Sequence, residues 1–163
     1  MSHTIDDFTN FYKKDKQKEK FYINNVIQSV SNIILPTLNS NKIDLKIDIK
    51  NDFELYSYPK ELAQVLLNLI QNAKDAILLN KIQNPQIEII VKNKQIVIRD
   101  NANGIEEEIL EKIFEPYFTT KEKHKGTGLG LYMSKMILEK NMNARINVKN
   151  IENGVEFKID FPN

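Results

Sequence analysis

The sequence predicts an α+β fold: a two-layer α/β sandwich whose mixed, mostly antiparallel sheet of about five strands packs on about three helices. Apolar and polar residues alternate in several short segments, which is typical of half-buried strands. Apolar residues also recur at helical spacing in longer segments. The predicted strands mostly join through short turns, so we expect antiparallel hairpins with the helices collected on one face.

The composition is that of a globular domain and excludes several other classes. Hydrophobic residues make up 41% and charged residues 28%, and the formal net charge of +1 gives no electrostatic footprint for nucleic acid. Without cysteine there is no disulfide or thiolate site, and His3 and His124 alone argue against structural zinc. We expect a cytoplasmic location, because the start is polar and no apolar run is long enough to span a membrane.

The first half of the chain alternates helix and strand signals. Residues 4–20 carry a short apolar stripe at helical spacing, and residues 21–38 predict a second helix, with Pro36 near its end as an expected kink or stop. Residues 42–50 alternate strictly and predict a strand. Residues 53–58 predict its hairpin partner.

The second half begins with the strongest helix signal, over residues 59–80, because proline is tolerated in a first helical turn. Its predicted core face holds Leu62, Val65, Leu66, Leu69, Ala73 and Ile77. The remaining predicted elements are two strands within 86–100 joined at Asn93-Lys94, a short helix over 105–114, a loop over 115–125, a helix over 128–141, and a closing hairpin over Glu152-Asn153-Gly154.

A polar stripe runs along the helix predicted at 59–80. Glu61, Asn68, Asn72 and Asp75 share one face, although asparagine is a mediocre helix former. This face is either a solvated surface or the polar wall of a ligand cleft. In the second case an asparagine oxygen is a ligand suited to Mg²⁺.

Two further segments have chemistry of their own. "RDNANGI" places Asp100 at a strand end before Gly104, which is either a plain turn or a carboxylate that accepts a hydrogen bond from a ligand amine. "GTGLG" places Gly126, Gly128 and Gly130 at alternate positions where a helix opens. It matches neither a Walker loop nor a dinucleotide fingerprint, so it is either an anion site built from backbone N–H groups or a flexible hinge.

Four motifs in order resemble one family. "NLIQNAKDA", "DNANGI", "FEPYFTT" and "GTGLGL" resemble the N box, first glycine box, F box and second glycine box of the catalytic ATP-binding domain of bacterial sensor histidine kinases, in the GHKL or Bergerat-fold superfamily. The resemblance covers roughly residues 21–162. Each box alone is a weak signal, whereas four in this order are specific.

The resemblance implies ATP and Mg²⁺ as cofactors. Asp100 would accept a hydrogen bond from the adenine amino group, Asn72 would ligate Mg²⁺, and Asn68 would lie near the phosphates. Phe114, Pro116, Tyr117 and Phe118 would anchor a lid. The implied nucleotide-binding residues are Asn68, Asn72, Asp75, Asp100, Gly104, Ile105, Phe118, Thr119, Thr120, Lys121, Gly126, Thr127, Gly128, Leu129, Gly130 and Leu131.

One position departs from the family pattern. Ala102 stands where the first glycine box usually has glycine. A methyl group there could narrow the adenine pocket, and alanine disfavours positive φ.

The resemblance also implies parts that this sequence lacks. Residues 1–20 are interpreted as the C-terminal remnant of a dimerisation helix pair and residues 21–163 as the catalytic domain. His3 does not fit the phosphoacceptor, since Phe8 stands where the family commonly has proline, and His124 is interpreted as a lid or loop residue. The partners implied are a dimerisation domain with the accepting histidine and a response regulator, within a homodimer that could be membrane-anchored.

Two alternatives stay open at this point. One is an anti-sigma-type serine kinase of the same fold. The other is a nucleotide-binding interaction module without transfer activity, degenerate at Ala102.

Overall fold

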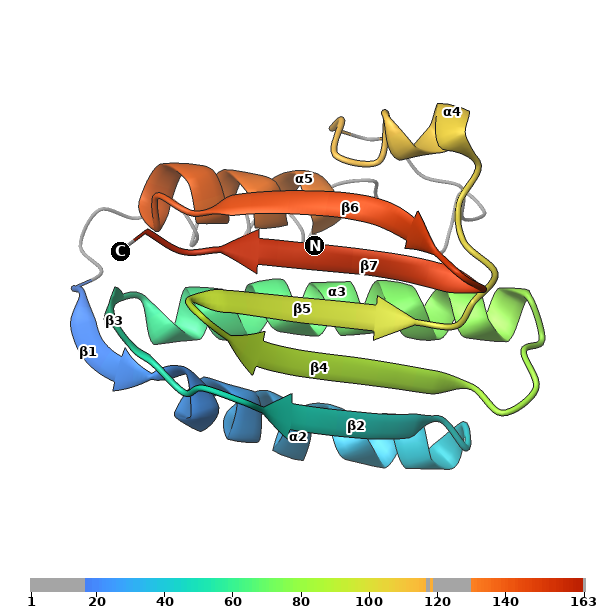
Figure 1. Cartoon of the computed structure of the whole chain (residues 1–163), viewed down its shortest axis with the longest axis horizontal. Coiled ribbons are helices and arrows are strands. Elements are labelled where there is room, and N and C mark those ends of the chain that lie inside the picture. The colour runs from blue at the N-terminus through green and yellow to red at the C-terminus, as the bar shows by residue number, and fades with distance from the viewer. Residues whose placement is uncertain (1–16, 117, 119–129, 163) are drawn as a thin grey trace, which may run out of the picture.

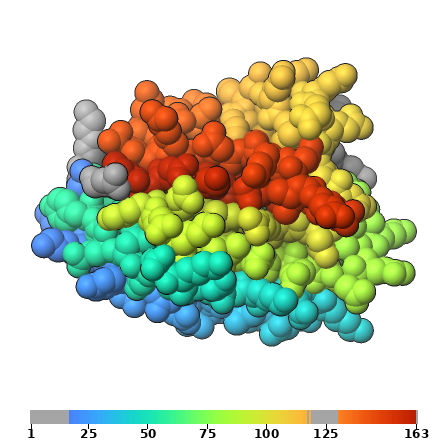
Figure 2. Space-filling model, viewed as in Figure 1, coloured from blue at the N-terminus to red at the C-terminus, as the bar shows by residue number. Residues whose placement is uncertain are grey.

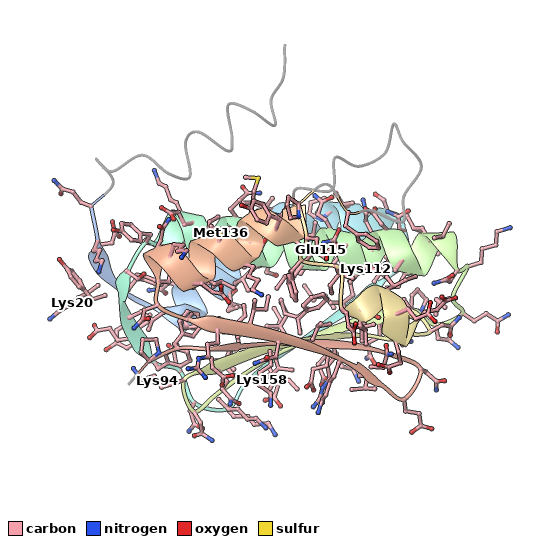
Figure 3. All side chains as sticks on the ribbon, turned by 90° about the horizontal axis from the view of Figure 1, so that it is seen from above. Lys20, Lys94, Lys112, Glu115, Met136 and Lys158 are labelled. Atoms are coloured by element: carbon pink, nitrogen blue, oxygen red, sulfur yellow. The ribbon has the colours of Figure 1, made fainter. Side chains whose placement is uncertain are left out.

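The computed structural model describes residues 17–116, residue 118 and residues 130–162, and it confirms the predicted two-layer α+β architecture. A five-stranded sheet in the order β2-β4-β5-β7-β6 forms one layer, and helices α2, α3 and α5 cover one of its faces (Figure 1). Seen edge-on, Met136 lies in the helix layer, whereas Lys94 and Lys158 lie in the sheet layer (Figure 3). The strands of this sheet are β2 (Asp44–Ile49), β4 (Gln86–Lys92), β5 (Gln95–Asp100), β6 (Arg145–Ile151) and β7 (Gly154–Asp160).

The inner face of the sheet is continuous and apolar. Ile87 on β4 pairs with Asp100 on β5, and Ile89 pairs with Ile98, so every second residue of each strand faces the helices. Asp100 therefore stands on the inner face at the last position of its strand. The fully buried inner residues include Ile87, Ile89, Val91, Ile96 and Ile159.

Helices α2 (Ile23–Ser40) and α3 (Pro59–Leu79) follow their predicted periodicity. All six residues predicted for the core face of α3 are buried. The stop expected at Pro36 is wrong, because α2 continues through it to Ser40. Leu38 is fully buried beyond the proline, and the Ser40 hydroxyl donates a hydrogen bond to the carbonyl of Pro36, so packing outweighs one missing N–H group.

Two expectations in the first half are wrong. The helix expected over 4–20 lies mostly outside the described residues, but Glu19–Tyr22 form strand β1, so it does not extend to residue 20. The expected hairpin between 42–50 and 53–58 does not form. Instead β3 (Glu54–Ser57) pairs with β1 as a separate two-stranded sheet, and β2 pairs in parallel with β4.

The reason lies where β2 ends. The N–H groups of Lys50 and Asn51 both donate to the carbonyl of Val91, which keeps the chain alongside β4 beyond the strand. The carbonyl of Phe53 then accepts from the N–H of Ile23, which draws the chain toward the start of α2. The apolar face of β2 is thereby placed over the core, a gain that a local hairpin would forfeit.

The second half follows the predicted order with shifted boundaries. Asn93 and Lys94 have φ of 48° and 63°, as a two-residue hairpin turn requires. The short helix is confined to α4 (Glu107–Leu110), and the helix expected over 128–141 is described from α5 (Gly130–Met136) into a π-helical turn, η1 (Ile137–Asn141). The final turn has only Glu152 and Asn153 at its tip, because Gly154 already pairs with Ile151.

The outer face of the sheet, which is turned toward the viewer in the space-filling view of Figure 2, carries the charged residues Glu88, Arg99, Glu156 and Lys149. Glu156 on β7 is only 4% exposed and accepts a hydrogen bond from Arg99 Nε at 2.8 Å, while Lys149 Nζ on β6 lies 3.5 Å away. Arg99 also lies 3.8 Å from Glu88 on β4, so one charge network crosses four strands. No helix in the described part of the chain is long and apolar enough to cross a membrane.

Candidate functional site

The candidate site begins at Asp100, on the inner face where β5 ends. Its Oδ1 accepts a hydrogen bond from the N–H of Ala102 at 3.0 Å. Burial raises the pKa of the Asp100 carboxyl above its ordinary value, although backbone hydrogen bonds from Ala102 and Val155 oppose this shift. A partly desolvated carboxylate with so few neighbouring donors is suited to accept a hydrogen bond from a bound molecule.

The turn after Asp100 is held by asparagine side chains from distant segments. Asn101 accepts from the N–H of Gln86 at 2.9 Å and donates to the carbonyl of Asn84 at 3.0 Å. Asn80, just beyond the end of α3, donates to the carbonyl of Ala102 at 2.9 Å. The loop is therefore fixed in shape rather than being a plain surface turn.

Ala102 does not have the strain that the sequence suggested. It is 2% exposed, belongs to the hydrophobic core, and is not among the residues with positive φ. Positive φ falls instead on Asn103 and Gly104, at 74° and 83°. Because asparagine and glycine adopt this conformation most readily, the alanine fits this loop without backbone strain.

Gly154 is a site residue that the sequence showed only as part of a turn. A Cβ atom built on Gly154 would lie 1.7 Å from the carbonyl oxygen of Asp100. Only glycine allows β7 to start this close to the end of β5. The closeness of these two strands fixes the backbone of Asp100.

Asn150 on β6 is a second residue that sequence reasoning missed. Its amide accepts from the N–H of Ile105 at 2.8 Å and donates to the carbonyl of Ile105 at 2.6 Å. A signal was present, since Ile146 and Val148 precede it on the same face of the strand and are apolar. Asn150 is the next residue on that inner face, so a polar side chain stands where the alternating pattern predicts an apolar one.

The polar face of α3 links both ends of the site. Asn68 Nδ2 lies 3.4 Å from the carbonyl of Gly130 and 3.3 Å from Ser134 Oγ, so Asn68 contacts the first turn of α5. Asn72 and Asp75 are partly buried, between this contact and the contact of Asn80 with the loop. The polar stripe is therefore a wall between α5 and the loop, not a fully solvated surface.

Glu61, the first member of that stripe, differs from the others. It is 2% exposed and accepts a hydrogen bond from Asn141 Nδ2 at 2.6 Å, at the end of η1. The contact joins the first turn of α3 to the end of the α5–η1 segment. Glu61 therefore belongs to the packing of the helices rather than to an open cleft.

The residues expected to anchor a lid are described only in part. Phe114 packs edge-on against Phe157 of β7 with ring centroids 6.3 Å apart, and Lys135 Nζ lies 5.3 Å from the Phe114 ring centre. Phe118 is partly buried against the core, whereas Pro116 is exposed. Of the predicted site residues, Thr119, Thr120, Lys121, Gly126, Thr127, Gly128 and Leu129 lie outside the described residues, as does Tyr117.

A groove of about 430 Å³ lies elsewhere, between β1, α2 and the start of α3, and its lining includes Tyr22, Val26 and Lys60. Strand β1 and the first turns of α2 and α3 lie at the opposite end of the sheet from the end of β5, where Asp100 stands (Figure 1). The groove contains none of the predicted site residues. We therefore assign the candidate site from the chemistry of Asp100 and the loop that follows it, and not from the volume of this groove.

The donor groups fit Mg²⁺ held jointly with a nucleotide. Asn72 and Asn68 each carry an amide oxygen of the kind that Mg²⁺ accepts as a ligand. The described residues include no cluster of three or more acidic, histidine or cysteine side chains that could hold a metal ion alone. Mg²⁺ commonly takes one or two protein oxygens and obtains the rest from phosphates and water.

Comparison with known proteins decides the family. The family model described as "Histidine kinase-, DNA gyrase B-, and HSP90-like ATPase" matches residues 57–163, well over half of the chain. The chain belongs to this ATPase family. Within it, the chain is 38% identical over 109 residues to the two-component sensor PprA of Pseudomonas aeruginosa and 31% identical over 150 residues to sporulation kinase A of Bacillus subtilis.

Solved structures place this ATPase-family chain with histidine kinase catalytic domains. The nucleotide-free catalytic domain of histidine kinase ThkA is 32% identical, with a TM-score of 0.79, and the match covers 90% of this chain and 96% of that domain. ThkA in complex with the response regulator TrrA also matches, at 27% identity and a TM-score of 0.75, over 97% of this chain and 46% of that one.

The chain spans only a small part of its curated relatives. The alignments cover 63% of this chain but 12% of PprA, and 89% of this chain but 24% of sporulation kinase A. The chain thus corresponds to the kinase catalytic ATPase domain of much longer sensor proteins.

Proposed function

We propose that this catalytic domain binds Mg·ATP and donates the γ-phosphoryl group to a histidine on a dimerisation domain, for relay to a response regulator. The observation that carries the proposal is the partly desolvated carboxylate of Asp100 beside a loop held by Asn80 and Asn101. Such an acceptor complements the amino group of adenine, which donates hydrogen bonds. A buried acceptor without a donor costs free energy, so this pairing favours adenine over bases that present a carbonyl at that position.

In this proposal the phosphates extend from the base toward α5, along the polar face of α3. Asn72 is the Mg²⁺ ligand, with Asp75 nearby on the same helix. When bound, Mg²⁺ neutralises charge on the phosphate oxygens during transfer. The protein's own contribution is to bind and orient the nucleotide, because phosphoryl transfer needs positioning more than covalent help.

The partners in this proposal follow the relatives. ThkA is a histidine kinase solved with a response regulator, which supports a regulator as the final acceptor here. The full-length protein is proposed to be a homodimer whose dimerisation domain carries the accepting histidine, with residues 1–20 as the end of that domain and residues 21–163 as the catalytic domain. Anchoring in a membrane, with this domain in the cytoplasm, remains a prediction.

The test is a calorimetric titration of the chain with a non-hydrolysable ATP analogue, with and without Mg²⁺. We expect binding by the unmodified chain and a loss of about 10- to 100-fold for Asp100→Asn, since a hydrogen bond to a charged group contributes about 1.5–3 kcal/mol. Asn72→Ala should remove the Mg²⁺ dependence while leaving binding of the base. Asp44→Asn and Asn147→Ala, both at exposed strand positions, are matched controls.

No binding by a folded, unmodified chain at millimolar nucleotide would overturn the proposal. A second assay addresses the acceptor. With radiolabelled ATP, the chain alone should not label itself, whereas an added dimerisation domain with an intact histidine should gain acid-labile label. Label on the serine of an anti-sigma antagonist instead would favour a serine kinase.

A further inference from the structure

Asn150 lies in one row with the base-binding carboxylate. Val155 on β7 pairs with Asp100 on one side and with Asn150 on the other, so the three residues are neighbours across β5, β7 and β6. All three belong to the inner face at the same end of the sheet. Asn150 is thus two strands from Asp100, on the side toward α4.

The amide of Asn150 is fully engaged with one segment of backbone. Its oxygen accepts from the N–H of Ile105 at 2.8 Å, and its nitrogen donates to the carbonyl of Ile105 at 2.6 Å and to Glu107 Oε1 at 3.3 Å. Two opposed hydrogen bonds to one residue hold both of the peptide groups that flank the Cα atom of Ile105. Only the carboxamides of asparagine and glutamine offer an adjacent donor and acceptor of this kind, and glutamine is one methylene longer.

The loop is pressed closely against this amide. Gly104 has φ of +83°, and a Cβ atom there would lie 2.9 Å from Asn150 Oδ1. Asn80 and Asn101 hold the loop before Asn103, whereas Asn150 holds it after Gly104. The two ends of the loop are therefore held by separate sets of hydrogen bonds.

We propose that Asn150 is a positioning residue that holds the Gly104–Ile105 backbone beside Asp100 and so sets the affinity and selectivity for the nucleotide base. This inference rests on the proposed function. Asn150 acts through the backbone N–H and carbonyl of Ile105 and does not itself contact the base. Its removal affects recognition of the base, while recognition of the phosphates depends on α3 and α5.

The test compares Asn150→Ala and Asn150→Asp with Asn147→Ala, an exposed asparagine on the same strand that faces outward. The measurements are calorimetric affinities for ADP, GDP and inorganic tripolyphosphate. We expect both Asn150 variants to lose tenfold or more in ADP affinity and most of the preference for ADP over GDP. Their affinity for tripolyphosphate should stay within twofold of the unmodified chain.

Asn150→Asp keeps the shape of the side chain and the acceptor for the N–H of Ile105. Its second oxygen is repelled by the carbonyl of Ile105 and the carboxylate of Glu107, so this variant should weaken ADP binding at least as much as Asn150→Ala. Unchanged ADP affinity in folded variants overturns the inference, as does an equal loss for ADP and tripolyphosphate, which indicates general loosening. If the unmodified chain binds ADP, Asp100→Asn does not, and the Asn150 variants bind normally, only this inference fails. If the unmodified chain binds no nucleotide, the proposed function fails and this inference with it.

Amide hydrogen exchange of the unmodified chain tests the contact without any substitution. The Ile105 amide should exchange at least 100-fold more slowly than an unprotected amide, because Asn150 accepts its hydrogen bond. Exchange at the unprotected rate shows that the contact is absent in solution and overturns the inference, even if every Asn150 variant fails to fold.

Discussion

At the scale of single residues, Asp100 lowers stability at the position where we propose that it binds the nucleotide base. Its folded pKa lies above the ordinary value of 3.8 because of burial. The folded chain therefore keeps this proton to higher pH than the unfolded chain does, and the unfolding free energy falls as pH rises from about 3.8 through the folded pKa. This loss of unfolding free energy persists at neutral pH, where the ionised carboxylate is the acceptor in the proposed function.

Asp100→Asn should consequently have a higher unfolding free energy than the unmodified chain at pH 7, by about 1 kcal/mol. A gain of this size is common when a residue that is kept for function is replaced by one that suits the folded state better. The difference should vanish below pH 3.8, where the carboxyl is protonated in both states. Urea denaturation between pH 3 and pH 8 measures it, with Asp44→Asn as the exposed control. A variant that is less stable at every pH would contradict this account of Asp100.

Substitution of Gly154 tests how closely β5 and β7 must approach each other at the site. Gly154→Ala places a methyl group against the Asp100 carbonyl, so we expect it to cost about 3 kcal/mol, at the upper end for overpacking. Glu152→Ala in the same turn is exposed and should change stability by less than about 0.5 kcal/mol. Chemical denaturation of both variants gives the comparison, and equal stabilities would show that β7 can move away from Asp100 at little cost.

At the scale of elements, α3 positions α5 through polar contacts. Asn68 reaches Gly130 and Ser134, and Glu61 reaches Asn141, so the two helices are joined near both ends of the α5–η1 segment. A π-helical turn often marks a functional place in a helix. Here its last residue, Asn141, is the partner of the buried Glu61.

Asn68 therefore gives a prediction that separates positioning from ligation. Asn68→Ala and Ser134→Ala should each weaken ATP-analogue binding about three- to tenfold. The double variant should bind no more weakly than the weaker-binding single variant, because both substitutions remove the same Asn68–Ser134 hydrogen bond. Binding should stay Mg²⁺-dependent, unlike in Asn72→Ala. If Asn68→Ala abolishes the Mg²⁺ dependence, Asn68 is a ligand and its contact with α5 is secondary.

At the scale of the whole molecule, the two faces of the sheet have separate tasks. The inner face carries the core and the site, whereas the outer face carries the network of Glu88, Arg99, Glu156 and Lys149. Burial tends to raise the pKa of Glu156, but its hydrogen bond with Arg99 and the charges of Lys149 and Arg99 prevail, so its pKa is lowered. This network contributes stability above the unfolded pKa of 4.5 that is lost as pH falls through the folded pKa.

Glu156→Gln should lower the unfolding free energy by about 1–2 kcal/mol at pH 7, a modest figure because Arg99 and Lys149 are 40% and 64% exposed and screened by solvent. The difference from the unmodified chain should shrink as pH falls below 4.5. Nucleotide affinity should not change, since the residue faces away from the helices. Chemical denaturation measures the unfolding free energy, and calorimetry on the same sample measures the nucleotide affinity. A large loss of affinity would show that the two faces of the sheet are coupled.

Much of the site followed from the sequence because it depends on local patterns. Pro59 and the apolar spacing after it determined α3, and the same spacing placed Asn68, Asn72 and Asp75 on one face. Alternation over residues 86–100 determined the β4–β5 hairpin and put Asp100 at its end. These features need only the helical and strand periods and the chemistry of turns, which act within about ten residues.

Only the tertiary structure decided which distant segments meet. Residues 53–58 pair with β1 and not with β2, Gly154 meets the Asp100 carbonyl, and Asn150 holds Ile105 across a sequence separation of 45 residues. Strand pairing depends on which arrangement buries the most apolar surface, and a side chain's partners depend on that pairing. Periodicity states which face of each strand is apolar, but the energy of packing those faces together exists only in the assembled fold.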